Sequence, residues 1–261
     1  MELGIAGRRA LVTGGSKGLG FAIARELVGE GVHVAICSRD EDEIAAAGEA
    51  LRGAGDVVVH AQRANVSDAE EVRGCVARSA EALGGVDFLV NNAGRARPGG
   101  FETLTDEDWE ADLGVKLFAL VRCCREVLPH LRAAGGGRIV NIGAVQARAP
   151  DPKFFATSVN RAAGGSFTKT LALELAAENI LVNGVNIGYV VTPQWEAIHA
   201  RRAPELERDA FFRTLAEAEV PLGRFGSAEE VAGIVAFLLS ERASYITGAS
   251  VDVAGGLGRY V

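Results

Sequence analysis

Short apolar runs alternate with longer segments of helical spacing along nearly the whole chain. The runs are apolar at successive positions, which is typical of strands buried on both faces of a parallel sheet. The pattern predicts an α/β fold with one doubly wound parallel sheet of about seven strands and helices on both faces. The predicted strands are Arg9–Thr13, Val32–Ser38, Val57–His60, Phe88–Asn91, Arg138–Ile142, Leu181–Val185 and Ser250–Val253.

One segment, from about Gly188 to Gly223, departs from this alternation. It is charged, carries three prolines and includes helical pieces. An insertion between the sixth and seventh strands lies over the carboxyl ends of the strands, where ligands bind in such sheets. We therefore expect a single domain over residues 1–261, with a substrate lid at about 188–223.

Composition narrows the classes of partner and site. With 261 residues, 48% of them hydrophobic, the chain can bury the core of one sizeable domain. A formal net charge of -7 makes nucleic acid an unsuitable general partner. The four cysteines form no C-x-x-C pair and have no histidine at metal-ligand spacing, so we expect reduced thiols, no metal site and a cytoplasmic location. No signal sequence and no apolar run of about 18 residues is recognised, so no membrane contact is expected.

A glycine-rich segment follows the first predicted strand and opens an apolar helix. It reads Thr13-Gly14-Gly15-Ser16-Lys17-Gly18-Leu19-Gly20. Gly14 permits the tight turn, while Gly18 and Gly20 let the backbone approach a pyrophosphate and let the helix pack closely. The helix N-terminus adds free N–H groups and a partial positive charge. The segment therefore predicts a dinucleotide-phosphate cradle.

The end of the second strand predicts which dinucleotide is preferred. It reads Cys37-Ser38-Arg39, about 20 residues beyond the glycines. An acidic residue here binds a ribose 2′-hydroxyl, whereas Arg accommodates a 2′-phosphate. Lys17 adds a second positive charge inside the turn. We therefore expect NADP(H) to be favoured over NAD(H).

Further motifs make the chain resemble the short-chain dehydrogenase/reductase (SDR) family, of the 3-oxoacyl-reductase type, over almost its whole length. The motifs beyond Thr13–Gly20 are Asn91-Asn92-Ala93-Gly94, Asn65-Val66, Gly223-Arg224-Phe225-Gly226, Tyr245-Ile246-Thr247-Gly248 and Asp252-Val253-Ala254-Gly255-Gly256. The resemblance implies a Rossmann-type fold, an oxidoreductase acting on a small carbonyl or alcohol substrate, and a homodimer or homotetramer. The cofactor-binding residues it implies are Thr13, Gly14, Ser16, Lys17, Gly18, Leu19, Gly20, Ser38, Arg39, Asn65, Val66, Asn92, Ala93, Gly94, Arg161, Gly188 and Thr192.

The catalytic positions implied by the same resemblance hold unusual residues. SDR enzymes use an Asn-Ser-Tyr-Lys tetrad, in which Tyr donates the proton and Ser holds the substrate oxygen. The corresponding positions here are Lys116, Ala144, Thr157 and Arg161, so the tetrad is replaced. No shift of the alignment restores it, because none of the three tyrosines has Lys four residues later.

Lys116 is the candidate that stands in for the lost acid. A buried lysine has a lowered pKa, so Lys116 is suited to proton transfer. With Arg161 it would also form a cationic pocket for a carboxylate, phosphate or enolate, and the alternative is that its ammonium only fills vacated space. Other candidates for lining the pocket are Gln146, Arg148, Ser158, Tyr189, Gln194 and Trp195.

Three functions fit these observations. The one we favour is an atypical NADP(H)-dependent SDR that acts on a carbonyl or alcohol. The second is an NADP(H)-binding enzyme without redox chemistry, performing cyclisation, elimination or retro-aldol cleavage. The third is a cofactor-binding pseudoenzyme. Family resemblance favours the first, and the replaced tetrad favours the other two.

Overall fold

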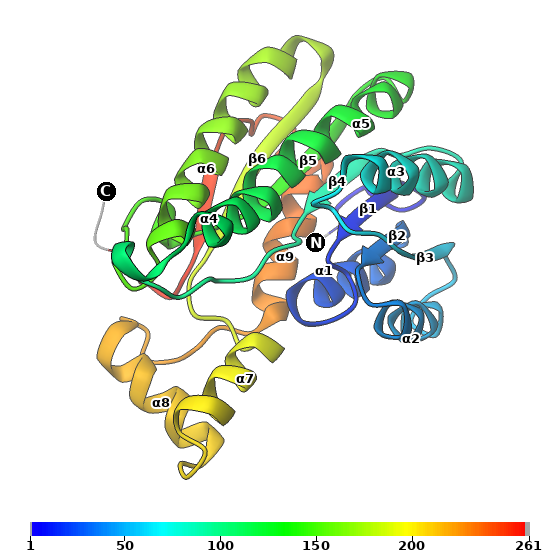
Figure 1. Ribbon diagram of the computed structural model, residues 1–261. Helices are drawn as coiled ribbons and strands as arrows, with labels where there is room; N and C mark the ends of the chain where they lie inside the picture. Colours follow the sequence, from blue (N-terminus) through cyan, green and yellow to red (C-terminus); the bar gives the residue numbers. More distant parts are fainter. Residues whose placement is uncertain (1, 259–261) are drawn as a thin grey trace.

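The computed structural model describes residues 2–258 and contains one seven-stranded parallel sheet (Figure 1). The strands are β1 (Arg9–Thr13), β2 (His33–Ser38), β3 (Val59–Arg63), β4 (Phe88–Asn91), β5 (Gly137–Ala144), β6 (Ile180–Ile187) and β7 (Ser250–Val253). Their order across the sheet is β3-β2-β1-β4-β5-β6-β7, and every pairing is parallel. The predicted doubly wound, Rossmann-type sheet is confirmed.

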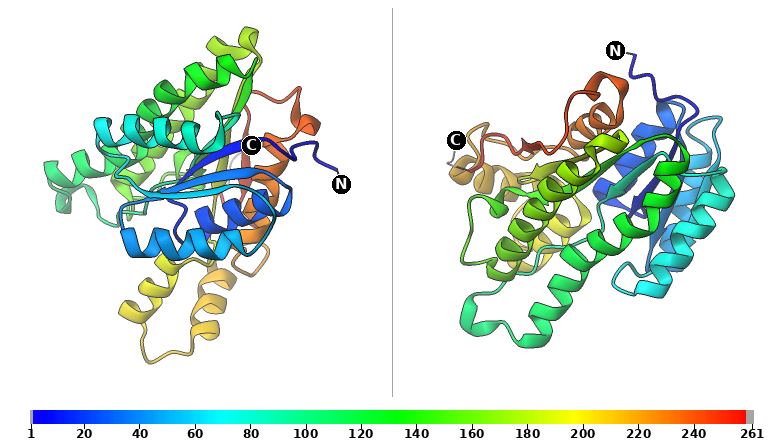
Figure 2. Two further views of the ribbon diagram at one scale, coloured as in Figure 1. Left: turned by 90° about the vertical axis from the view of Figure 1, so that its right-hand side faces the viewer. Right: turned by 90° about the horizontal axis from the view of Figure 1, so that it is seen from above.

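Helices cover both faces of this sheet (Figure 2). They are α1 (Gly18–Gly29), α2 (Glu41–Arg52), α3 (Ala69–Leu83), α4 (Asp106–Leu113), α5 (Ala119–Ala133), α6 (Phe155–Leu175), α7 (Pro193–Arg202), α8 (Arg208–Glu219) and α9 (Ala228–Leu239). Helices α1, α2 and α9 pack on one face, and α3, α5 and α6 on the other. Side chains alternate along each strand, so Val12 joins the first core and Leu11 the second. This two-sided burial explains why the strands are apolar throughout.

The strand order reverses between β1 and β4. The chain runs outward from β1 through β2 to β3, then returns to β4 on the other side of β1. The loops after β1 and β4 therefore leave the sheet in opposite directions and open a crevice at its carboxyl edge. The glycine-rich segment and Asn92 both lie at this edge.

A π-helical turn joins α4 to α5 and makes one continuous helix of the two. It spans Gly114–Phe118 and carries Lys116 at its centre. Such a turn inserts one extra residue into the helical repeat and recurs at functional sites. Although it is a lysine, Lys116 is 1% exposed, so the turn carries its side chain into the protein.

Helices α7 and α8 project from the carboxyl edge of the sheet, at the lower left of Figure 1. They have a small aromatic core of their own, formed by Phe211, Phe212 and Phe225, with Tyr189 and Trp195 packed against it. This is the segment for which the sequence predicts a lid. Between residues 2 and 258, no helix combines the length and hydropathy that a transmembrane span requires.

Candidate active site

A cavity of about 1100 Å³ lies at the carboxyl edge of the sheet, where the strand order reverses. The glycine-rich turn and the end of β2 line one part of it. The π-helical turn, α6 and the beginning of α7 line the other. All the predicted cofactor-binding residues except Thr13 line this cavity.

The glycine-rich turn has the shape of an anion cradle. Gly14 and Gly18 adopt φ values of 67° and 56°, a region that side chains disfavour. A Cβ added to Gly20 would lie 2.1 Å from the carbonyl oxygen of Gly14, so only glycine allows this packing. Within the described residues, no side chain caps the first turn of α1, and no acidic residue lies in that turn. The first N–H groups of α1 are thus available to a phosphate, as the prediction requires.

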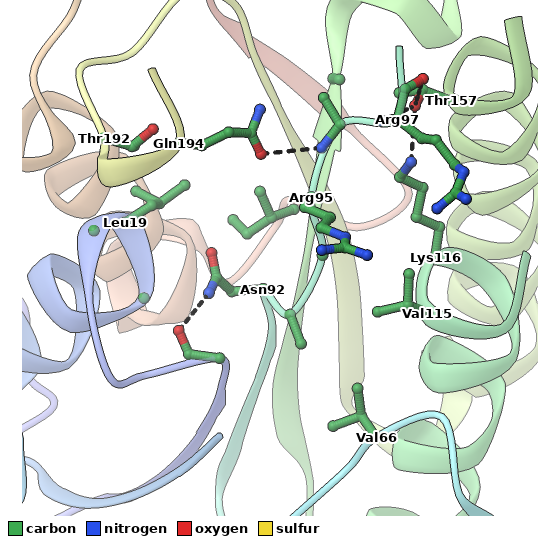
Figure 3. A pocket seen from close by; sticks show the side chains of 18 of the residues that line it. Leu19, Val66, Asn92, Arg95, Arg97, Val115, Lys116, Thr157, Thr192 and Gln194 are labelled. Carbon is green, nitrogen blue, oxygen red and sulfur yellow. Dashed lines mark hydrogen bonds between the residues drawn. The ribbon is translucent and has the colours of Figure 1, made fainter. Parts of the chain in front are cut away.

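Thr13 lies behind the cavity wall, outside the lining. Its side chain is buried, and its Oγ1 accepts hydrogen bonds from the backbone N–H groups of Asn92 and Ala93, at 3.0 and 3.1 Å. Asn92 in turn donates its side-chain amide to the carbonyl oxygens of Thr13 and Gly14, at 2.9 and 3.1 Å, and Figure 3 draws one of these bonds. These bonds fasten the loops after β1 and β4 together. Thr13 therefore stabilises the loops that form the crevice without lining the cavity itself.

Cations border the part of the cavity next to β2. Arg39 is exposed there, and its guanidinium makes no hydrogen bond or ion pair with any residue of 2–258. Lys17 lies within the turn, and its Nζ is 2.6 Å from Oε1 of Glu43. A phosphate placed here would meet Arg39 directly and would compete with Glu43 for Lys17.

Lys116 is the centre of a buried polar network in the other part of the cavity. Its Nζ donates to Oδ1 of Asp112, one helical turn earlier, and to Oγ1 of Thr157 at 2.8 Å. The second carboxylate oxygen of Asp112 accepts a bond of 2.9 Å from the side-chain amide of Asn160. Asp112, Lys116, Thr157 and Asn160 are all buried. Two helices, α4 with its π-helical turn and α6, hold this network.

The surroundings of Lys116 lower its pKa to about 8, from an ordinary value of 10.5. Burial is the largest cause, and the nearby Arg161 guanidinium adds to it, whereas Asp112 acts in the opposite direction. The ammonium therefore gives up its proton at a lower pH than an exposed lysine does. Lys116 and Arg161 line the same cavity and their charges interact, while the carboxylate of Asp112, a residue that the sequence analysis does not single out, partly neutralises them.

Arg161 lies between β5 and the Asn92–Gly94 loop. It donates to the carbonyl oxygen of Ile142, while its Nε is buried without a hydrogen-bond partner among residues 2–258. Burial lowers its pKa to about 10, so it stays charged at neutral pH. A cation with an unpaired donor at the cavity wall suits a ribose hydroxyl or a developing oxyanion.

Ala144 and the tyrosines of the described chain are poorly placed to donate a proton to a substrate. Ala144 lines the cavity but has no hydrogen-bonding side chain. Tyr189 also lines it, yet its hydroxyl donates to Glu219 at 2.5 Å, and burial with this carboxylate raises its pKa. Tyr245 is fully exposed and lies outside the cavity lining. Among residues 2–258, then, no tyrosine is placed to give a proton within the cavity.

Loop residues after β4 contribute side chains that the sequence analysis does not single out. Arg95 points into the cavity in Figure 3, and its guanidinium has no partner among residues 2–258. The backbone N–H of Arg97 donates to Oγ1 of Thr157 at 3.0 Å, and that of Ala96 to Oε1 of Gln194 at 3.1 Å. These bonds connect the loop to α6 and to the predicted lid.

Comparison with known proteins identifies the family. The sequence model of the family described as Enoyl-(Acyl carrier protein) reductase matches residues 14–258. The Homo sapiens protein named dehydrogenase/reductase SDR family member 4 is 36% identical over 254 residues, which cover 97% of this chain and 88% of that protein. The chain belongs to the SDR family.

Two solved SDR structures resemble it over nearly their whole length. L-Sorbose reductase from Gluconobacter frateurii, complexed with NADPH and L-sorbose, has a TM-score of 0.95 at 33% identity and covers 100% of both chains. A short-chain oxidoreductase from Pseudomonas aeruginosa PAO1, bound to NADPH and described as containing an atypical catalytic center, has a TM-score of 0.91 at 36% identity, covering 97% of this chain and 98% of that one. Both neighbours contain NADPH, which supports NADP(H) binding by this SDR.

Sequence reasoning on this SDR misses Asp112 and Asn160. Asp112 precedes Lys116 by four residues on one helix, a spacing at which Asp and Lys pair, and this signal was available. Asn160 approaches only through the packing of α6 on α4. Of the other pocket candidates, Gln146, Tyr189, Gln194 and Trp195 line the cavity, whereas Arg148 and Ser158 do not.

Proposed function

We propose that the protein is an atypical NADP(H)-dependent SDR oxidoreductase that interconverts a carbonyl and an alcohol, with Lys116 as its proton source. The observation that carries this proposal is the buried ammonium of Lys116, held by Asp112 and Thr157 at the cavity wall. Its lowered pKa supports the role, because a general acid acts best when its pKa is close to the working pH. We assign the family's tetrad positions to Lys116, Ala144, Thr157 and Arg161. The atypical center named for the Pseudomonas neighbour supports such a departure.

The chain's residues fit the cofactor in three places. The uncapped start of α1 and the glycine cradle would hold the pyrophosphate. Arg39 and Lys17 would hold the 2′-phosphate, and Arg161, with its unpaired Nε, the ribose next to the nicotinamide. When bound there, NADPH supplies a hydride to the carbonyl carbon. Arg161 also keeps positive charge near the oxygen that becomes negative in the transition state.

The substrate would occupy the part of the cavity between Lys116 and the predicted lid. Phe154, Trp195 and Ile198 make this part apolar, and Arg95 adds an unpaired guanidinium. We therefore propose a small carbonyl compound with an apolar portion and an anionic group for Arg95. Residues 188–223 would act as its lid within the single domain, because α7 carries Trp195 and Ile198 to the cavity.

The direct test is NADPH oxidation. The purified protein is mixed with NADPH and a panel of ketones with and without a carboxylate, and loss of reduced-nicotinamide absorbance is followed by stopped flow. We expect turnover with at least one ketone, and higher kcat/KM for the carboxylates. NADPH binding without oxidation by any ketone would contradict the proposal and would favour the non-redox enzyme or the pseudoenzyme.

Cofactor preference is expected to depend on Arg39. NADPH should bind at least tenfold more tightly than NADH, because a charged hydrogen bond contributes about 1.5–3 kcal/mol, roughly ten- to a hundredfold in affinity. Arg39→Ala should remove most of this preference, measured by calorimetry with each cofactor. Arg73 is an exposed arginine on α3, so Arg73→Ala is the matched control and should leave the cofactor preference unchanged. Equal affinities of the parent protein for both cofactors would refute this.

Quaternary structure is also expected to follow the family. We propose a homodimer or homotetramer formed through α5 and α6, and a cytoplasmic location, which the four buried free thiols support. Of the apolar residues on these helices, Leu120 and Leu175 face the core, but Leu173 is 70% exposed. Leu173→Glu should shift the mass toward the monomer in light scattering at micromolar concentration. A monomeric parent protein would contradict the assembly.

A further inference from the structure

Thr157 connects the buried ammonium of Lys116 to the cavity. Its Oγ1 accepts a hydrogen bond of 2.8 Å from Nζ of Lys116 and one of 3.0 Å from the backbone N–H of Arg97. A hydroxyl has two acceptor lone pairs and one donor. Both acceptor positions are therefore filled, and among residues 2–258 the hydroxyl proton has only a long contact, 3.5 Å, to the carbonyl oxygen of Arg97. That proton is the one group of Thr157 still available to a stronger acceptor.

Lys116 borders the cavity, but its ammonium is buried, so its access to a substrate is restricted. Its side chain is 0% exposed, and two of its three protons are held by Asp112 and Thr157. Thr157 lines the cavity at the position where the SDR tyrosine is expected. A proton that leaves Lys116 for the cavity thus passes a hydroxyl that is already hydrogen-bonded to it.

We propose that the Thr157 hydroxyl relays a proton from Lys116 to the substrate's carbonyl oxygen. This inference rests on the proposed carbonyl reduction. It also resolves a conflict in the chemistry, since a threonine hydroxyl is too weak an acid to replace tyrosine on its own. In the relay the hydroxyl is never ionised for long, because it gains one proton as it loses another.

Each proton that moves in the relay breaks one bond and forms another. The carbonyl carbon gains the hydride, with its electron pair, that NADPH supplies. The carbonyl oxygen takes the Thr157 proton, Oγ1 takes one from Nζ of Lys116, and an N–H bond breaks to leave a neutral amine. The amine regains its proton from solvent, and alcohol oxidation runs the same path in reverse. Asp112, held by Asn160, keeps Nζ aimed at Thr157 and is a positioning residue.

The test compares two substitutions of Thr157. Thr157→Val keeps the shape and removes the hydroxyl, whereas Thr157→Ser keeps the hydroxyl and removes a methyl group. We expect Thr157→Val to lower kcat by about 10²–10⁴, with unchanged NADPH affinity by calorimetry, and Thr157→Ser to retain most of the activity. Thermal unfolding shows whether Thr157→Val folds, and Thr157→Ala serves as a second hydroxyl-free variant if it does not.

A proton inventory in mixtures of H₂O and D₂O separates the relay from a structural role. Two protons move in the relay, so the rate of the parent protein and of Thr157→Ser should depend nonlinearly on the deuterium fraction. A linear inventory, or a Thr157→Val protein that retains full kcat while Lys116→Met does not, would overturn the relay and leave the proposed function intact. A parent protein that oxidises no NADPH with any ketone would overturn both.

Discussion

Lys116→Met is expected to lower kcat for carbonyl reduction by about 10²–10⁴, the usual effect of losing a general acid. Met preserves most of the buried volume and removes the ammonium. NADPH affinity, measured by calorimetry, should not change, because the glycine cradle and Arg39 lie at the other end of the cavity. An equal fall in kcat and kcat/KM would show that the lost interaction belongs to the transition state.

The control for this variant is Lys169→Met. Lys169 is exposed on α6, the same helix that carries Thr157, so the substitution removes one lysine charge without touching the buried network. Its kcat should match the parent value. If Lys116→Met also kept full kcat on a confirmed substrate, Lys116 would be a space-filling residue and not the proton source.

The same residue sets the expected pH dependence. Reduction needs the charged ammonium, so kcat should be flat at low pH and fall as pH rises through the Lys116 pKa of about 8. Alcohol oxidation needs the neutral amine and should rise over the same interval. Arg161, with a pKa of about 10, stays charged in this range. A reduction rate that stays constant to pH values well above 8 would exclude Lys116 as the acid.

Much of the fold is predictable because burial on both faces marks each central strand. β1 and β4 have the predicted bounds, since their apolar runs end at Thr13 and Asn91, where the chain turns toward the cavity. The edge strand β3 is displaced from the prediction. It spans Val59–Arg63 and includes Gln62, whose amide is buried against Ser79 and the carbonyl oxygen of Cys75. The hydrophobic pattern does not distinguish such a polar strand residue from a loop residue, because its hydrogen-bond partners come together only in the folded protein.

The cofactor part of the site is more predictable than the catalytic part for a physical reason. The glycine-rich turn is local, so its spacing alone specifies the conformation in which Gly14 and Gly18 appear. The environment of Lys116 depends on the π-helical turn, which no proline or other helix-breaking residue in the sequence predicts. It also depends on Asn160, which lies 48 positions from Asp112 in the sequence. Only the folded chain shows that the lysine's charge is held by a carboxylate.

The second large effect is expected for stability. Asp112→Leu should destabilise the protein by about 3–5 kcal/mol, since it leaves the ammonium of Lys116 buried without its counter-charge. The loss should be greatest at low pH and shrink as pH rises toward 8, because without Asp112 the lysine pKa falls further and the neutral amine that then forms is cheaper to bury. Urea unfolding at fixed protein concentration and several pH values measures both features.

A double-mutant cycle assigns this loss to the ion pair. Asp112→Leu combined with Lys116→Met replaces both charges by apolar groups, and such replacements of a buried pair are often neutral in stability. The double variant should therefore be more stable than Asp112→Leu alone, although it is inactive. Lys17 and Glu43 offer a matched exposed pair, for which Glu43→Leu should cost less than about 1 kcal/mol. If the two buried substitutions proved additive within about 0.5 kcal/mol, Asp112 and Lys116 would not be energetically coupled, and the carboxylate would have no part in holding the proton source.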